Sequence, residues 1–394
     1  MAGGSIRADS ERAYEISRWI LTEGRLAPSP ARFLTGLCAR LVDAGLPLWR
    51  VTIYAATLHP QIRGFGWRWW RERHVTEEVR IARGVELTAD YLESPLRGPI
   101  ERGEAMRRQG DALGDFPLLR EFRTEGCTDY VAAPLNRIGE RFPAVAWATD
   151  RAGGFTAEQL ALLEEIRPAL AAVIETVVAR RTARNLFSIY HGSQVGERVF
   201  DGQIERGHLE PLRAAIMATD LRGFTGMSDQ LPADEVIGAL DDYFEYVTEG
   251  VHAERGHVLK FIGDGVLAIF GAEDGRDAEA ADAALAAARA IVVRLAARDP
   301  GAVELRAGIG LHLGTVMYGN VGAPDRLDFT AIGPAVNLAF RLEGLTKSLR
   351  RPVLASRAFA EAARQALLPL GAHPIRGLSE PEDVFGLPEH APAG

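Results

Sequence analysis

The chain reads Phe261-Ile262-Gly263-Asp264-Gly265-Val266-Leu267 between two predicted strands. Glycine and aspartate between two apolar runs predict a tight hairpin, because such turns need residues that tolerate a positive φ. The turn lifts the Asp264 carboxylate to the end of two buried strands. Taken alone, a Gly-Asp-Gly sequence is more often only a turn than a metal site.

A second carboxylate follows an earlier apolar run. Residues 214–219 end at Asp220 and continue into Leu221-Arg222-Gly223-Phe224-Thr225. A lone strand-end aspartate is usually a helix cap or a solvated loop residue. If the two strand ends converge, however, Asp220 and Asp264 make a site for hard divalent cations, which take oxygen ligands. Two such cations can activate an attacking oxygen and hold a phosphate.

Three further polar side chains stand out against apolar surroundings. Lys260 lies in the otherwise apolar strand 258–262, where a lone lysine often serves only to block edge-to-edge aggregation. Residues 328–332 predict another strand, and a helix begins after it at Pro334. On that helix Asn337 and Arg341 share one face, because they lie four residues apart. Beside a phosphate this pair suits transition-state stabilisation, although a solvated polar stripe is the common alternative.

From about residue 206 to residue 387 the chain resembles the catalytic domain of class III adenylate and guanylate cyclases. The matching stretches occur in the family's order, at residues 218–225, 260–265, 308–314, 319–322 and 332–341. An apolar helical stripe over 236–251, an alanine-rich helix over 277–298 and a strand over 305–313 fit an α+β fold. We expect a ferredoxin-like domain, a sheet with helices on one face.

The resemblance implies a metal-dependent site. Asp220 and Asp264, with the Leu221 carbonyl as an extra ligand, would hold two Mg²⁺ or Mn²⁺ ions per active site. Such ions lower the pKa of the ribose 3′-hydroxyl and neutralise charge on the triphosphate as pyrophosphate leaves. The backbone from Arg222 to Thr225, which includes Gly223 and Phe224, would hold phosphate groups through its N–H groups.

The resemblance also assigns the groups that orient the substrate. Asn337 would orient the ribose, and Arg341 would stabilise charge on the α-phosphoryl oxygens in the transition state. Arg376 is a looser match to a basic position that contacts the terminal phosphates.

Base choice rests on Lys260 and Thr330. Adenylate-selective family members of the Thr type carry these residues, whereas guanylate-selective members usually carry Glu and Cys. The chemistry agrees, because a lysine donates to adenine N1, whereas guanine N1 carries a proton. A threonine oxygen accepts from the adenine 6-amino group. ATP is therefore the expected substrate, with a guanylate cyclase as one alternative.

In this family the two aspartates come from one protomer, and the Lys, Thr, Asn and Arg come from the other. A chain with all six residues is therefore expected to form a head-to-tail homodimer with two composite sites. The alternative from another functional class is a catalytically silent dimerising module, in which the first half of the chain is the functional receptor.

The first half of the chain has a different composition. It holds all six tryptophans, and it predicts helices over 12–23 and 30–45. Strands are expected over 51–57, 131–135 and 144–149, and a strand or loop over 65–73. A capping box of Thr156 and Gln159 opens a long helix. This order resembles GAF-type sensor domains. We predict a GAF-like regulatory domain over 1–175 that receives an unknown small-molecule or protein signal, a helical linker over 176–207 ending in a second short helix, and the cyclase domain over 208–394.

Composition excludes several other classes. The net charge of −8 and the pI near 5.7 argue against nucleic acid as a partner. No run of 18 uncharged apolar residues and no apolar signal core occur, so no membrane span and a cytoplasmic protein are expected. The two cysteines are too few for a disulfide framework. His59, His74 and Cys127 lack the spacing of metal or haem ligands.

Overall fold

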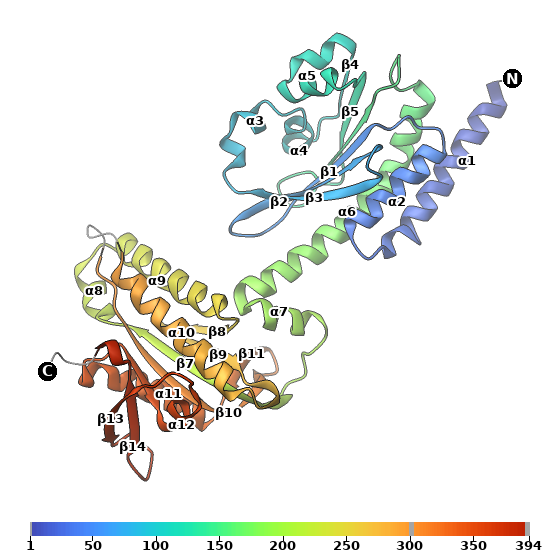
Figure 1. The fold of residues 1–394 in the computed structure, drawn as a ribbon. Coiled ribbons are helices and arrows are strands. Elements are labelled where there is room, and N and C mark those ends of the chain that lie inside the picture. Colours follow the sequence, from blue (N-terminus) through green and yellow to red (C-terminus); the bar gives the residue numbers. More distant parts are fainter. Residues whose placement is uncertain (1, 299–302, 391–394) are drawn as a thin grey trace. The chain divides into compact units, whose positions relative to one another are not determined.

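The computed structural model describes residues 2–298 and 303–390 (Figure 1). The chain divides into two compact units, residues 1–186 and 187–394, and each is described by itself. The boundary between the units falls inside one helix, α6 (Ala157–His191). The finer division into 1–175, 176–207 and 208–394 stays a prediction. Within the described residues, no helix is both long enough and apolar enough to cross a bilayer.

The first unit is built on a six-stranded antiparallel sheet with the order β3-β2-β1-β6-β5-β4. Its strands are β1 (Arg50–Ala56), β2 (Ile62–Trp70), β3 (Val75–Ala82), β4 (Met106–Gln109), β5 (Asp129–Pro134) and β6 (Ala144–Thr149). Successive side chains of a strand point to opposite faces. Accordingly Val51 and Ile53 enter one core, whereas Tyr54 enters a cluster on the other face.

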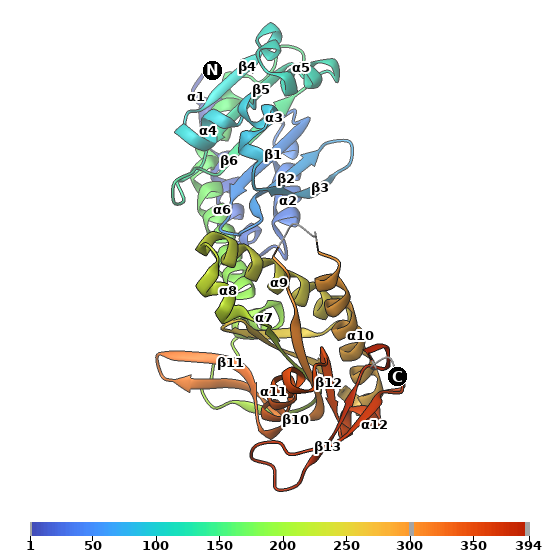
Figure 2. The same ribbon diagram turned by 90° about the vertical axis from the view of Figure 1, so that its left-hand side faces the viewer.

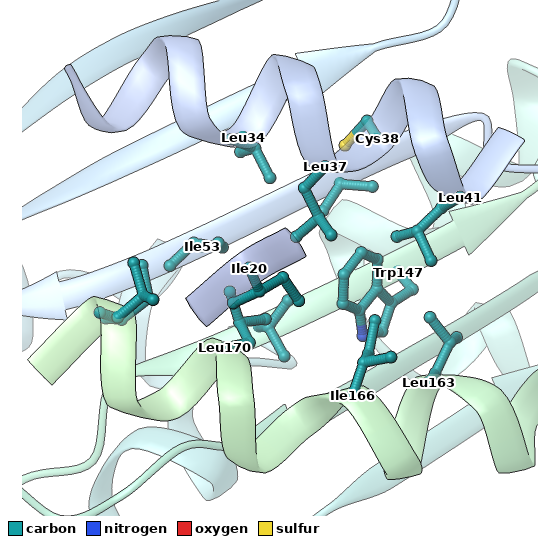
Figure 3. Close-up of a cluster of buried hydrophobic side chains, with 14 of the residues drawn as sticks. Ile20, Leu34, Leu37, Cys38, Leu41, Ile53, Trp147, Leu163, Ile166 and Leu170 are labelled. Atoms are coloured by element: carbon teal, nitrogen blue, oxygen red, sulfur yellow. The ribbon is translucent and has the colours of Figure 1, made fainter. Parts of the chain in front are cut away.

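Helices cover both faces of this sheet. The larger core is formed with α1 (Ala2–Leu21), α2 (Pro30–Asp43) and α6, whose apolar side chains meet those of the strands (Figure 3). The other face carries α4 (Arg97–Arg102) and α5 (Pro117–Thr124), and α3 (Ala89–Leu92) precedes them in the chain. The predicted capping box is confirmed, because Gln159 N donates to Thr156 Oγ1 at 3.3 Å and Thr156 N donates to Gln159 Oε1 at 3.0 Å.

The second unit contains an eight-stranded sheet in which β13-β14-β12-β10-β7-β9-β8 are neighbours and β11 pairs with β10. Its inner order β10-β7-β9-β8, with helices between the strands, is the ferredoxin-like arrangement that was predicted. The bounds are β7 (Leu209–Leu221), β8 (His257–Ile262), β9 (Gly265–Gly271), β10 (Ala307–Ala323), β11 (Arg326–Ile332), β12 (Val353–Ser356), β13 (Leu368–His373) and β14 (Glu382–Gly386). Figure 2 shows the β10–β11 hairpin, in orange, standing out from the sheet.

The prediction of helices on one face is corrected by the packing. Helices α9 (Ala233–Ala253) and α10 (Asp277–Ala296) run side by side and bury one face, together with Ala215 and Met217 of β7. Helix α11 (Pro334–Leu349) packs against the opposite face, together with Ala214 and Ile216 of β7. Residues 214–218 of β7 are apolar on both faces of the strand, so the sheet must be covered by helices on both sides.

Three short helices complete the unit, namely α7 (Ser193–Phe200), α8 (Phe224–Gln230) and α12 (Arg357–Ala362). The second linker helix was predicted to reach Gly207, but α7 ends at Phe200. Turns that include Gly202 and Gly207, both with positive φ, occupy the remaining stretch before β7. Glycines in that conformation end a helix readily.

Candidate active site

Two carboxylates lie side by side at one end of the second sheet. Asp220, near the end of β7, is paired in register with Gly265, the first residue of β9. Gly263 and Asp264 form the two-residue loop between β8 and β9, with Gly263 at φ 64°. The predicted hairpin is therefore confirmed, and it brings Asp264 within hydrogen-bonding reach of Asp220.

The environment of Asp220 disfavours ionisation of its carboxyl group beside that of Asp264. The pKa of Asp220 is raised to about 6, first by burial and then by the carboxylates of Asp264 and Glu343, while Arg222 opposes the shift. Two neighbouring carboxylates repel each other unless a proton or a cation lies between them. A divalent cation would remove this repulsion.

The donor set fits Mg²⁺ or Mn²⁺, because both ions prefer carboxylate, carbonyl and water oxygens. No group of three or more His, Cys, Asp or Glu side chains suited to a metal occurs among the described residues. The site offers the carboxylates of Asp220 and Asp264. Leu221 is buried and pairs with Ala307 of β10, and a role of its carbonyl as a ligand stays a prediction.

The predicted phosphate-binding backbone lies directly beyond Asp220. Gly223 precedes α8 and has φ 76°, a backbone conformation that residues other than glycine rarely adopt. An added Cβ at Gly223 would meet nothing within 4 Å, so its outer side is open. Thr225 is exposed and Phe224 is partly buried at the start of the helix.

Lys260 and Thr330 come from strands that lie beside each other, β8 and β11. A bulge in the β8–β9 pairing between Val258 and Lys260 redirects the residues that follow it. The Lys260 ammonium pairs with Asp328 of β11. Two residues further along β11, Thr330 Oγ1 is buried and has no hydrogen-bond partner among the described residues.

Helix α11 carries the other two predicted groups. Gly333, with φ 139°, precedes the helix, and Pro334 occupies its first position, as predicted. Asn337 is exposed and Arg341 is partly exposed, so both side chains remain available to a ligand.

Arg376 lies in a loop that borders Arg341. An added Cβ on its neighbour Gly377 would lie 3.0 Å from Arg341 Nη2, so the loop backbone packs against the guanidinium. Two arginines are thereby held in one region of the unit. Arrangements of this kind suit an anionic substrate.

Three side chains near these groups were given no role from the sequence, namely those of Arg222, Asp328 and Glu343. One signal for this region was available in the composition. The chain has only two lysines, Lys260 and Lys347, because arginine occupies nearly every other cationic position. Lysine and arginine differ in shape and hydrogen bonding, so a lysine kept in such a chain indicates a need for an ammonium group.

Comparison with known proteins places this region in a family. Residues 211–357, which include Asp220, Lys260, Asp264, Thr330, Asn337 and Arg341, match the family model of the adenylate and guanylate cyclase catalytic domain. The chain contains a cyclase catalytic domain. The resemblance inferred from the sequence motifs is thereby confirmed for this region, and the comparison does not reach the GAF-like assignment of the first half.

Curated relatives match over the cyclase domain. An uncharacterized protein of Mycobacterium tuberculosis is 38% identical over 205 residues, which cover 52% of this chain and 37% of the relative. Adenylate cyclase 1 of Rhizobium meliloti is 36% identical over 194 residues, which cover 46% of this chain and 29% of the relative. The chain spans only about a third of the length of these relatives.

Solved structures with similarity to the cyclase domain include cyclases of both nucleotide classes. A bacterial light-regulated adenylyl cyclase is 31% identical, with a TM-score of 0.41, covering 46% of this chain and 92% of that chain. The guanylyl cyclase Cya2 is 27% identical, with a TM-score of 0.38, covering 45% of this chain and 92% of that chain.

Proposed function

We propose that this protein is an adenylate cyclase, which converts ATP into 3′,5′-cyclic AMP and pyrophosphate. The observation that carries the proposal is the pairing of Asp220 with Asp264 at the open end of the cyclase sheet, where mutual repulsion favours divalent cations. The two carboxylates would hold two Mg²⁺ or Mn²⁺ ions. When bound, these ions supply activation of the 3′-hydroxyl and charge neutralisation on the triphosphate.

The chain's own side chains orient the reacting groups. Asn337 hydrogen-bonds the ribose and sets its 3′-oxygen in line with the α-phosphorus. Arg341 places a permanent cation beside the α-phosphoryl oxygens, where negative charge builds up in the transition state. Arg376, in the loop that packs against Arg341, contacts the terminal phosphates, and the backbone of residues 222–225 donates N–H groups to the triphosphate.

Selection of adenine is supported by the unpartnered hydroxyl of Thr330. A buried hydroxyl without a hydrogen bond is unfavourable, so it favours a ligand that supplies one. The adenine 6-amino group donates to this oxygen, and the Lys260 ammonium donates to N1. Guanine carries a proton on N1, which cannot accept from the ammonium, so the Lys260 contact would fail. The Thr330 hydroxyl can also donate to the guanine carbonyl, so the discrimination rests mainly on Lys260.

The proposed active form is a head-to-tail homodimer with two equivalent composite sites. Each site takes its two aspartates from one chain and Lys260, Thr330, Asn337 and Arg341 from the other. The first unit, as a GAF-like domain, would regulate the cyclase domain in response to a small molecule or a protein. Helix α6 supports this role, because it runs without a break through the boundary between the two units.

Nucleotide turnover by the full chain tests the proposal. ATP and GTP are supplied in turn, with Mg²⁺ and then Mn²⁺, and cyclic nucleotide and pyrophosphate are both measured. Asp264→Asn serves as the inactive variant, and Asp277→Asn serves as a matched control at an exposed ion pair with Arg213. The proposal is supported if the control variant forms cyclic AMP and Asp264→Asn does not.

Other outcomes separate the alternatives. Cyclic GMP in excess over cyclic AMP identifies a guanylate cyclase. No product from either nucleotide with either metal favours the catalytically silent dimerising module.

A further inference from the structure

One arginine connects the carboxylate end of β7 to helix α11. Arg222 follows Asp220 by two residues, and its Nη2 donates to the Glu343 carbonyl oxygen at 3.0 Å. The same nitrogen lies 2.9 Å from Glu343 Oε1, and the side chains of Arg222 and Glu343 are only 25% and 10% exposed. The ion pair is therefore largely withdrawn from water.

Two glycines of β10 make this contact possible. A Cβ at Gly308 would overlap the Arg222 guanidinium, and a Cβ at Gly310 would overlap the α11 backbone at Ala339 and Glu343. The strand thus leaves one space for the arginine and one for the helix. At Gly310 the obstructing atoms are backbone, so the helix approaches closely only because the residue is glycine, whereas a Cβ at Gly308 would displace the Arg222 side chain from its present position.

Glu343 depends on this arrangement. Its Oε1 is buried and has no well-aligned hydrogen bond among the described residues, although Arg222 lies beside it. A buried carboxylate without a neighbouring cation is strongly unfavourable. Arg222 also acts electrostatically on Asp220, so it is attracted by Asp220 on one side and by Glu343 on the other.

The two ends of the ion pair serve different catalytic sites. Asp220 and Asp264 of a chain belong to one composite site of the proposed dimer, whereas Asn337 and Arg341 of that chain belong to the other. Glu343 follows Arg341 by two residues on the same helix. An ion pair inside one chain therefore joins the metal-binding half of one site to the substrate-orienting half of the other.

We propose that Arg222 and Glu343 are positioning residues that act on both sites of the dimer at once. Glu343 draws Arg222 away from the aspartates and so leaves them free for cations. Cations at the aspartates repel Arg222 toward Glu343 and so fix α11 for the second site. This inference rests on the proposed function.

A binding measurement without turnover tests the first effect. Mn²⁺ binding to the full-length homodimer is followed by electron paramagnetic resonance, with a non-cyclising ATP analogue present. In Glu343→Gln the released Arg222 charge competes with the cation, so Mn²⁺ binds about five-fold or more weakly. The control Asp277→Asn removes an ion pair between α10 and Arg213 of β7, and it leaves Mn²⁺ binding unchanged. Equal binding by the wild type and Glu343→Gln overturns the proposal.

Hydrogen exchange tests the second effect. Mn²⁺ with the ATP analogue should slow amide exchange in α11 of the wild type. The same addition should leave exchange in α11 of Glu343→Gln nearly unchanged. Equal slowing in both proteins contradicts a link between the aspartates and α11.

Heterodimers separate the two sites. One chain carries Asp264→Asn and the other carries Arg341→Ala, so one intact site remains. Glu343→Gln in the Arg341→Ala chain, which supplies the aspartates of that site, raises the Mg²⁺ requirement and retains kcat. Glu343→Gln in the Asp264→Asn chain, which supplies Arg341, lowers kcat and retains the Mg²⁺ requirement. If Glu343→Gln has an effect only in the Asp264→Asn chain, Glu343 merely stabilises α11 and the proposal is overturned.

Two controls keep the outcomes distinct. Arg222→Gln removes the competing cation, so it should not weaken Mn²⁺ binding, and Mn²⁺ with the ATP analogue should no longer slow amide exchange in α11. This variant decides the matter if Glu343→Gln fails to fold, because weakened Mn²⁺ binding or retained slowing in Arg222→Gln would overturn the proposal. An inactive wild type refutes the proposed function. If the wild type is active but the heterodimer of Asp264→Asn and Arg341→Ala chains is inactive, the composite sites are refuted. Both of these results are distinct from the results that overturn the ion-pair inference.

Discussion

Lys260 and Asp328 form an ion pair between β8 and β11, and the unpartnered hydroxyl of Thr330 lies two residues further along β11. The pair is partly exposed, so its own contribution to stability is about 1 kcal/mol or less. Its importance lies in placement. The carboxylate holds the ammonium on the neighbouring strand, in the region where a nucleobase is proposed to bind.

Chemical labelling of lysine can test this placement directly. Lys260 and Lys347 are the only lysines in the chain, so an amine-reactive reagent has two side-chain targets. A non-cyclising ATP analogue at about ten times its Kd should slow labelling of Lys260 roughly ten-fold, because bound adenine covers the ammonium. The corresponding GTP analogue should protect it far less. Peptide mass spectrometry measures both sites, with exposed Lys347 as the internal control. Equal protection by the two analogues would refute the assignment of Lys260 to base selection.

Asp220→Asn should stabilise the protein in the absence of divalent cations at pH 8. Burial, and after it the neighbouring carboxylates, raise the pKa of Asp220 from the ordinary value of 3.8 to about 6, so the folded state binds its proton more tightly than the unfolded state does. Stability is consequently lost as the pH rises through about 6, and an uncharged asparagine avoids that loss. With allowance for solvent screening, we expect a gain of about 1 kcal/mol at pH 8.

Thermal melting from pH 4 to pH 8 measures this difference. The gain should shrink steadily toward pH 4, where the wild-type carboxyl is protonated. Added Mg²⁺ or Mn²⁺ should raise the wild-type Tm and leave that of Asp220→Asn nearly unchanged. A gain that is independent of pH would show that ionisation of Asp220 does not govern it.

Gly310→Ala should damage both folding and activity. The added methyl group would overlap the α11 backbone at Ala339 and Glu343, so the helix must move away from β10. We expect a loss of about 2 kcal/mol or more, as for other overpacked cores, and at least a ten-fold fall in turnover. Gly344→Ala is the matched control, because a Cβ there meets nothing within 4 Å and alanine favours a helix by about 1 kcal/mol. Denaturant unfolding and cyclic nucleotide assays follow both variants, and unchanged activity in Gly310→Ala would contradict the close approach.

Glu78 fastens α6 to the first sheet. Arg181 of α6 donates two hydrogen bonds to it, at 2.6 and 2.9 Å, and Trp67 Nε1 donates a third at 2.8 Å. The hydrogen bonds from Arg181 are the first cause of a lowered pKa of Glu78. Glu78→Gln should therefore cost about 1 kcal/mol at pH 7, and the cost should fall as acid protonates the wild-type carboxylate.

Glu78→Ala separates the two interactions. It also leaves the buried indole N–H of Trp67 without an acceptor, which adds about 1 kcal/mol or more. Urea unfolding and amide exchange over residues 178–186 measure these effects. Identical stabilities for Glu78→Gln and Glu78→Ala would show that the Trp67 hydrogen bond contributes little.

Much of the cyclase domain could be read from the sequence, because its decisive signals are local. The turn at Gly263 and Asp264, the strand that ends at Asp220 and the helix that begins at Pro334 each depend on neighbouring residues. The capping box of Thr156 and Gln159 is local in the same way, and the structure contains all of these features.

What the sequence could not supply depends on residues that are distant in the chain. The partners Lys260 and Asp328 are 68 residues apart, and Arg222 and Glu343 are 121 residues apart. The side of the sheet on which α11 lies was also missed. The apolar residues of β7 predict burial on both faces but do not say which helix covers which face.

The spaces above Gly308 and Gly310 also bear on how such a protein can change over evolutionary time. A larger residue at position 310 meets the backbone of α11, and one at position 308 displaces the Arg222 guanidinium, so substitution at either position disturbs the contact between β10 and α11. Positions 260 and 330, in contrast, hold the two side chains that are proposed to contact the nucleobase. A descendant could therefore acquire a new nucleobase preference by exchanging those two side chains, while the glycines persist unchanged beneath the helix.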